Sequence, residues 1–217
     1  MNKGKVVEVQ ISEKLGNVSV MITPANTPKA VMLLAHGAGA GMKHPFLESV
    51  ANGLAENSIT TVRFNFLYME KKMKRPDPPA IAEKAVEVLI DHVHSQYPGL
   101  KFFVGGKSFG GRMTSQRLAK ECPSFVKGIV FFGFPLHAPG KPSIDRAAHL
   151  EKISIPMLFL QGTRDALAEM TLMEKVCSTL PTATLIKFNG ADHSFKVAKS
   201  VIIPELISNV VNWMNNQ

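Results

Sequence analysis

The alternation of short, wholly apolar runs with helical patterns is the feature that most constrains the fold of this chain. Residues 30–35 (AVMLLA) are too few for a helix and lie between Pro28 and Gly37. Runs of this kind are typical of strands that are covered on both faces of a sheet. We expect about eight strands: a hairpin of residues 6–11 and 18–22 that turns at Gly16-Asn17, and the runs 30–35, 61–66, 101–104, 128–132, 157–160 and 184–188.

Helical patterns separate these predicted strands. Phe46, Val50 and Leu54 recur at the spacing of one helical face. Similar patterns occur near residues 81–92, 113–120 (with Met113 expected on the outer side), 170–180 and 206–214. Strands that alternate with helices favour an α/β fold with a mostly parallel sheet and helices on both faces. Because 217 residues fit one compact unit, we expect a single domain over residues 1–217.

The composition is that of a globular protein. Apolar residues make up 45% of the chain and charged residues 19%, which excludes a disordered chain and a fibrous repeat. The two cysteines, Cys122 and Cys177, are too few for a disulfide scaffold and indicate free thiols in a reducing compartment. Residues 1–16 lack the apolar centre of a secretory signal, and no run of about 18 apolar residues occurs. We therefore expect a cytoplasmic protein with no membrane-spanning helix.

The formal net charge of +8 raises the question of a nucleic-acid partner. Specific readers of nucleic acids use arginine forks and exposed aromatic rings, whereas the aromatic residues here fall inside the apolar runs. We therefore expect a lysine-rich surface that favours anionic substrates, with nucleic-acid binding as the weaker alternative.

The predicted strand 101–104 is followed by GGKSFGG, in which residues 106–110 form the pattern G-x-S-x-G around Ser108. A strand that turns directly into a helix holds its central residue in a strained conformation, and small neighbours on both sides let the two backbones pass. The serine hydroxyl then lies at a helix N-terminus, where a developing anion is stabilised. The pattern is weak as a string of letters, but its place between a strand and a helix predicts a nucleophile.

A serine nucleophile needs a base and an orienting carboxylate. Asp165 follows the strand 157–160, and His193 follows the strand 184–188, so both lie at strand ends in the order nucleophile, acid, base. Each residue alone is equally well explained as a turn residue. Together they predict a Ser108–His193–Asp165 triad, with Asp192 as a rival acid that is poorly placed because it adjoins His193 in the chain.

The segment 36–41 (HGAGAG) follows the predicted strand 30–35 and is poor in side chains. Such a loop lets backbone N–H groups approach a substrate oxygen, and we expect the N–H groups of Ala38 and Phe109 to form an oxyanion hole. A phosphate-binding loop is the alternative. It is disfavoured because the segment lacks the Lys-Ser/Thr ending of a P-loop and the spacing of a dinucleotide fingerprint.

Two irregular segments, 68–79 and 135–152, follow strand ends and are expected to roof a shallow pocket. The candidate substrate contacts are Gly37, Gly39, Tyr68, Arg75 and His137, although a rim histidine without a role is the more common case. No histidine or cysteine spacing indicates a metal site, and no cofactor is expected.

These motifs make the chain resemble the α/β-hydrolases, and the likeness runs from about residue 18 to the C-terminus. It is carried by HGAGAG (36–41), GGKSFGG (105–111), GTRD (162–165) and GADHSF (190–195). RFNF (63–66), KRPDPP (74–79) and FGFPLHAPGKP (132–142) resemble a narrower, lidless group related to dienelactone hydrolases. That group includes a subunit of the human NSL histone-acetyltransferase complex and its testis-expressed relative.

The resemblance implies an eight-stranded sheet whose second strand is antiparallel, and a triad at Ser108, Asp165 and His193. Dienelactone hydrolases proper use a cysteine nucleophile, so the serine here leaves their substrate in doubt. Only residues 134–155 separate the sixth and seventh strands, which is too short for a helical cap domain.

We therefore expect a serine hydrolase that acts on a small carboxylic ester or thioester. A catalytically weak interaction subunit is one alternative. A peptidase or an acyltransferase with the same triad is another.

Overall fold

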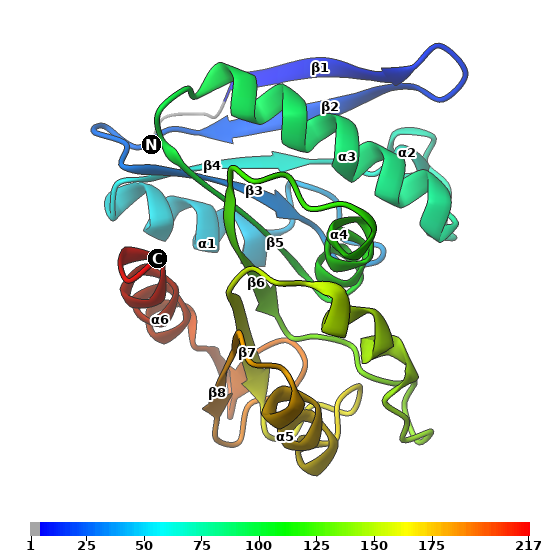
Figure 1. Cartoon of the computed structure of the whole chain (residues 1–217), viewed down its shortest axis with the longest axis vertical. Coiled ribbons are helices and arrows are strands. Elements are labelled where there is room, and N and C mark those ends of the chain that lie inside the picture. Colours follow the sequence, from blue (N-terminus) through cyan, green and yellow to red (C-terminus); the bar gives the residue numbers. More distant parts are fainter. Residues whose placement is uncertain (1–4) are drawn as a thin grey trace.

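The computed structural model describes residues 5–217 and contains a central sheet of eight strands (Figure 1). The strands are β1 (Lys5–Ser12), β2 (Gly16–Thr23), β3 (Ala30–Ala35), β4 (Ile59–Phe64), β5 (Lys101–Lys107), β6 (Val126–Phe132), β7 (Met157–Gly162) and β8 (Ala183–Phe188). Their order in the sheet is β1-β2-β4-β3-β5-β6-β7-β8. The six strands from β3 to β8 are parallel, and β2 is antiparallel to both of its neighbours. The expected sheet is confirmed, including its antiparallel second strand.

Helices cover both faces of this sheet. They are α1 (Pro45–Glu56), α2 (Leu67–Glu70), α3 (Pro79–Gln96), α4 (Phe109–Lys120), α5 (Met170–Thr179), α6 (Ile203–Asn215) and the 3-10 helix η1 (Asp145–Lys152). Figure 1 shows α1 and α6 on one side of the sheet and α3, α4 and α5 on the other. A short hairpin, β9 (Lys196–Val197) and β10 (Ser200–Val201), precedes α6.

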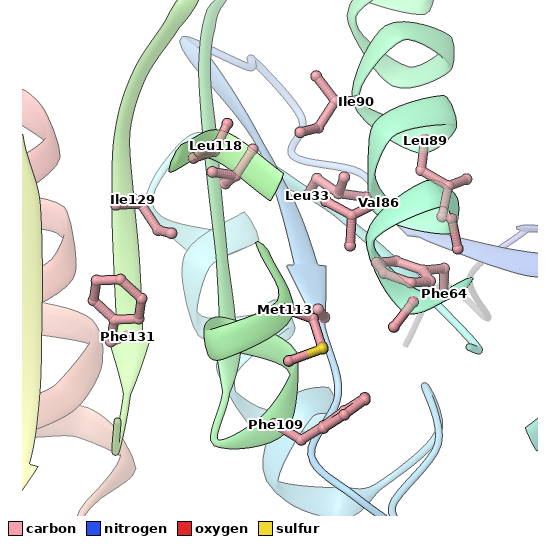
Figure 2. Close-up of a cluster of buried hydrophobic side chains, with 14 of the residues drawn as sticks. Leu33, Phe64, Val86, Leu89, Ile90, Phe109, Met113, Leu118, Ile129 and Phe131 are labelled. Atoms are coloured by element: carbon pink, nitrogen blue, oxygen red, sulfur yellow. The ribbon is translucent and has the colours of Figure 1, made fainter. Parts of the chain in front are cut away.

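The two faces of the sheet bury separate apolar clusters, which explains the wholly apolar strands. In β3, Leu33 packs into the cluster beneath α3 and α4, while Met32 and Leu34 pack into the cluster beneath α1 and α6. Figure 2 shows part of the first cluster, with Val86 of α3 and Met113 of α4 beside the strands. The expectation that Met113 faces outward is wrong: its side chain is fully buried, because α3 and η1 flank α4 on the sheet.

The N-terminal hairpin forms, but its turn lies earlier in the chain than expected. Residues 13–15 make the turn, Ser12 pairs with Gly16, and Gly16 begins β2 with a φ of +89°. A three-residue hairpin loop of this kind needs a residue at positive φ where β2 begins, and glycine adopts that conformation without strain. Gly16 therefore ends the turn rather than standing at its centre.

The connection from β6 to β7 holds η1 as its one helix and no cap domain, as expected. Within residues 5–217, no helix has both the length and the apolar character needed to cross a membrane.

The carboxyl end of β3 is tied to that of β4 by a buried histidine. The ring of His36 donates from Nδ1 to the Gly37 carbonyl at 2.7 Å, and its Nε2 accepts the N–H of Phe66 at 3.1 Å. His36 is fully buried, and burial lowers the pKa of its ring from 6.5 to about 4. The ring is therefore neutral at pH 7, and its two bonds need that neutral form.

Acid is expected to destabilise the protein through His36. The unfolded chain binds a proton at His36 near pH 6.5, and the folded chain does so only near pH 4, so stability falls as the pH drops through this window. The full loss from this one group is on the order of 3 kcal/mol. Urea unfolding between pH 7.5 and 4.5 measures it, and His36→Asn should make the slope shallower. Part of the slope should remain, because burial also lowers the pKa of His149 to about 4. A free energy of unfolding that is constant over this range would contradict the prediction.

Close packing of α4 on β3 leads to a second prediction, which compares two glycines. A Cβ on Gly110 would lie 2.5 Å from the His36 carbonyl oxygen, whereas one on Gly37 would meet Lys107 atoms at an ordinary 3.5 Å. Gly110→Ala should lower the free energy of unfolding by at least about 2 kcal/mol, because backbone atoms cannot give way. Gly37→Ala should change it by less than about 1 kcal/mol. Equal losses in thermal or urea unfolding would refute this account.

Candidate active site

Ser108 lies between β5 and α4 in a backbone conformation that L-residues rarely adopt, with φ 51° and ψ −114°. The turn is so tight that the glycines two residues before and two residues after Ser108 have no room for a side chain. A Cβ on Gly106 would lie 2.5 Å from the N atom of Gly111, and one on Gly110 would collide with the end of β3. The Ser108 hydroxyl is thereby held at the first turn of α4, as the G-x-S-x-G pattern predicts.

The structure brings Ser108, His193 and Asp165 into one chain of hydrogen bonds. The Ser108 Oγ lies 2.9 Å from Nε2 of His193, and Nδ1 of His193 lies 2.6 Å from Oδ2 of Asp165. Asp165 follows β7 and His193 follows β8, and the two strands are parallel neighbours. Both loops therefore leave the sheet at the edge where β5 delivers Ser108. With Nδ1–H donating to the carboxylate, Nε2 is free to accept the serine proton.

Two further hydrogen bonds hold the Asp165 carboxylate, and the sequence pattern does not predict the one from Gln161. The side-chain N–H of Gln161 donates to Oδ2 at 2.6 Å, and the N–H of Leu167 donates to Oδ1 at 2.8 Å. Gln161 is itself fixed because its Oε1 accepts the N–H of Phe134. The one signal in the sequence was a polar residue directly after an apolar run.

Asp192 does not compete for the histidine ring. Its Oδ1 accepts the backbone N–H groups of Ser194 at 2.8 Å and Lys196 at 3.0 Å. The carboxylate therefore closes the turn that carries His193, as its adjacency in the chain suggests.

Ala38 lies in the loop after β3 and Phe109 begins α4, and these two segments pack closely together. Ala38 lines the cavity beside Ser108, and Phe109 is the first residue of α4. Neither N–H group has an acceptor within residues 5–217. A helix N-terminus and a side-chain-poor loop thus leave two donors available for a substrate oxygen.

The loop that carries Ala38 is fastened along its length. The N–H of Gly39 donates to the Tyr68 hydroxyl at 2.8 Å, and the N–H of Met42 donates to Oδ1 of Asn65 at 2.8 Å. The buried guanidinium of Arg63 donates to the Met42 carbonyl at 3.0 Å. The polar residues of RFNF and the following tyrosine therefore hold the loop from the end of β4.

A cavity of about 600 Å³ opens beside Ser108 and His193. Its walls are mostly apolar, and they come from the start of α1 and from the segment around the β9–β10 hairpin. The apolar lining side chains include Phe46, Leu47, Leu167, Val201 and Ile203. The cavity therefore lies between α1 and the chain that follows His193. The expected roof of residues 68–79 and 135–152 is wrong, because neither segment contributes a lining residue.

Of the five expected substrate contacts, Gly37 lies in the cavity wall, and the other four do not. The N–H of Gly39 is bonded to Tyr68, which is buried in α2, and burial raises the pKa of the Tyr68 hydroxyl. Arg75 is exposed on the outer side of this segment.

The segment after β4 is more regular than its composition indicated. Residues 67–70 form α2, and Oδ2 of Asp77 accepts the N–H of Tyr68 at 3.1 Å in the first turn of that helix. Burial raises the pKa of the Asp77 carboxyl. The KRPDPP segment thus supports Tyr68 and, through it, the loop that follows β3.

His137 has a structural position in the loop after β6. Its Nδ1 donates to the Ala138 carbonyl at 2.9 Å, and its Nε2 accepts the N–H of Glu169 at 2.8 Å. Both ring nitrogens are therefore occupied, and the buried ring ties this loop to the start of α5.

Lys107 also belongs to the site, although no sequence pattern predicts a role for it. It lines the cavity, and its Nζ donates to the carbonyl oxygen of His193 at 2.7 Å. Burial lowers the pKa of its amine from 10.5 to about 8, and the Asp165 and Asp192 carboxylates oppose that shift. The available signal was its place directly before the nucleophile.

No group of three or more His, Cys, Asp or Glu side chains in residues 5–217 is arranged to hold a metal ion. Ser108, His193 and Asp165 instead provide a hydroxyl, an imidazole and a carboxylate joined by hydrogen bonds, which are the groups that nucleophilic catalysis requires.

Comparison with known structures identifies the same architecture in other proteins. An α/β serine hydrolase homologue from Coxiella burnetii superposes with a TM-score of 0.79 at 19% identity, covering 99% of this chain and 98% of that one. A lidless α/β serine hydrolase from Xanthomonas campestris gives 0.77 at 18%, covering 100% and 95%. A dienelactone hydrolase from Anabaena variabilis gives 0.76 at 18%, covering 99% of each chain. At these identities the likeness shows the fold.

The sequence itself also matches the model of a known protein family. The model of the alpha/beta hydrolase domain matches residues 28–208, which is most of the chain. The narrower likeness to the NSL-complex subunit stays a prediction. On the evidence of the sheet, the missing cap and this match, the chain belongs to the α/β-hydrolase family.

Proposed function

We propose that the protein hydrolyses a carboxylic ester or thioester through an acyl-enzyme on Ser108. The observation that carries the proposal is the unbroken chain from Ser108 Oγ through His193 to Asp165, at 2.9 and 2.6 Å. The two unbonded N–H groups beside it supply the place for the carbonyl oxygen of the substrate. A similar fold occurs in a protein named for a lactone, which is a cyclic ester, and this agrees with the bond type proposed.

In the first half of the reaction, Ser108 Oγ attacks the acyl carbon while Nε2 of His193 takes the hydroxyl proton. The carbonyl oxygen becomes an oxyanion and accepts the N–H groups of Ala38 and Phe109. One such donor is typically worth about 2.7–4 kcal/mol of barrier. When the tetrahedral intermediate collapses, His193 gives its proton to the leaving alcohol or thiol.

In the second half, a water molecule replaces the leaving group. His193 takes a proton from this water, the hydroxide attacks the acyl carbon, and Ser108 recovers its proton from the imidazolium. Asp165 keeps the proton of the ring on Nδ1 and stabilises the imidazolium that forms in both halves. Because Gln161 and Leu167 hold the carboxylate, the ring needs little reorganisation during the reaction.

The cavity indicates the kind of substrate that fits. Its apolar walls beside Ser108 favour an acyl or leaving group of mostly hydrocarbon character. With no cap domain above it, the cavity is bounded by α1 and by the short hairpin after β8. A small ester or thioester suits this space better than a folded protein chain.

A fluorophosphonate probe tests the nucleophile. We expect the native protein to be labelled and Ser108→Ala to be unlabelled, because the phosphorus traps only an activated serine. Ser178→Ala, which removes an exposed hydroxyl on α5, should label like the native protein. Labelling of Ser108→Ala would mean that another group is the nucleophile. Failure of the native protein to react would favour a non-catalytic interaction subunit.

Asp165→Asn tests the orienting acid. The amide keeps the shape but favours the wrong tautomer of His193, so kcat should fall by roughly 10³–10⁴ with little change in fold. Asp192→Asn is the matched control and should lower kcat by less than about tenfold, since that carboxylate bonds only backbone N–H groups of its own turn. Steady-state hydrolysis of a p-nitrophenyl ester measures both, and the reverse ranking would reassign the acid.

A further inference from the structure

Lys107 touches the loops that follow three other strands of the sheet. Its carbon stem lies beside Gly37 after β3, where an added Cβ would be 3.5 Å from the Lys107 Cγ. Its amine lies beside Gly133 after β6, where an added Cβ would be 3.3 Å from Nζ. After β8, the amine bonds the His193 carbonyl and stands 5.6 Å from the centre of the Phe195 ring. One side chain thus reaches every loop of the site except that of Asp165.

Two consecutive residues, Lys107 and Ser108, hold His193 by its main chain and by its ring. Ser108 bonds the ring through Nε2 at 2.9 Å, and Lys107 bonds the main-chain carbonyl of the same residue at 2.7 Å. The two contacts close a ring that runs from the Lys107 amine through His193 to Ser108 and back along the chain. A shift of the His193 loop away from Ser108 therefore breaks the lysine bond as well.

The other hydrogen bonds of this loop do not reach the strand of the nucleophile. Asp192 bonds the N–H groups of Ser194 and Lys196, which lie in the same turn. The N–H of Arg164 donates to the Ala191 carbonyl and ties the loop to the one after β7. Within residues 5–217, Lys107 alone bonds the His193 carbonyl.

Packing does not explain an amine at this place. Burial lowers the pKa of the Lys107 amine to about 8, which means that folding works against its charge. Methionine fills a similar volume without that desolvation penalty. The amine remains a donor in both protonation states, so its bond to His193 persists across neutral and alkaline pH.

We propose that Lys107 is a positioning residue, whose bond to the His193 carbonyl keeps the imidazole in line with Ser108. The proposal rests on the proposed function, in which His193 is the base. It assigns to the residue between glycine and serine in G-K-S-F-G a role in orienting the base. Substrate contact is not needed for that role, so Lys107 should affect kcat more than KM.

The first test is Lys107→Met, which keeps the stem and removes the donor. We expect kcat to fall about tenfold and KM to stay within about twofold, because the hydrogen bond that positions the base is lost while no substrate contact is removed. Lys101→Met is the matched control: the same substitution at the exposed, opposite end of β5 should leave both constants unchanged. A kcat within twofold of native would overturn the proposal. Should Lys107→Met not fold, Lys107→Leu, which also lacks a donor, takes its place.

Chemical rescue separates the amine from packing. Lys107→Cys treated with 2-bromoethylamine carries an amine at the length of lysine, since the thiolate displaces bromide. This treatment should restore at least about half of the native kcat if the donor is what matters. The native protein, treated in the same way, controls for Cys122 and Cys177. If the treated variant is folded but its kcat does not recover, the proposal is wrong.

Hydrogen exchange gives a readout that needs no turnover. In Lys107→Met, amides of residues 190–197 should exchange about fivefold faster than in the native protein, with the rest of the sheet unchanged. If the native protein hydrolyses no ester or thioester, the proposed function fails, and this comparison still decides whether Lys107 holds the loop. Equal exchange in the two proteins would refute that.

Discussion

The strained backbone of Ser108 is the constraint from which the rest of the site follows. A residue with φ 51° between a strand and a helix is stable only if the chain before and after it can approach the neighbouring strand closely. Gly106 and Gly110 allow that approach, since a methyl group on either would collide with backbone atoms. The same contact brings the first N–H of α4 next to the loop that follows β3. One packing contact therefore places both the Ser108 hydroxyl and the two N–H groups that the proposed function assigns to the oxyanion.

Around this turn, the site is assembled from strand ends that are held before any substrate binds. Polar side chains that are buried or, for Lys107, half-buried hold each loop: His36 and Tyr68 hold the loop after β3, Gln161 holds Asp165, and Lys107 holds the His193 loop. Each is a polar group placed among apolar neighbours, where an unsatisfied partner is expensive. Polar groups that are fixed in this way stabilise a developing charge without reorganising, which is what the proposed function requires.

The irregular segments 68–79 and 135–152 show where composition misleads. A high content of proline, lysine and glycine indicates that a segment lacks a long periodic pattern, but it does not indicate whether the segment lies over the cavity or away from it. In the structure these segments lie outside the cavity and hold its neighbours in place. Asp77 accepts the N–H of Tyr68 in the first turn of α2, and His137 ties its loop to the start of α5. The cavity wall comes instead from Phe46 and Val201, in segments whose apolar residues also fit an ordinary helix start and a short hairpin.

From residue patterns alone, the eight strands of the central sheet, the longer helices, the strained serine, and the order of Ser108, Asp165 and His193 along the chain are predictable. These are local properties, because periodicity and turn chemistry act over a few residues. Which side chains meet depends on how the whole chain folds, since Lys107 and His193 are 86 positions apart and no sequence pattern links them. The cavity and the supporting contacts of Gln161, Tyr68 and Lys107 depend on the sheet order β4-β3-β5-β6-β7-β8. That order is set by the packing of the whole core.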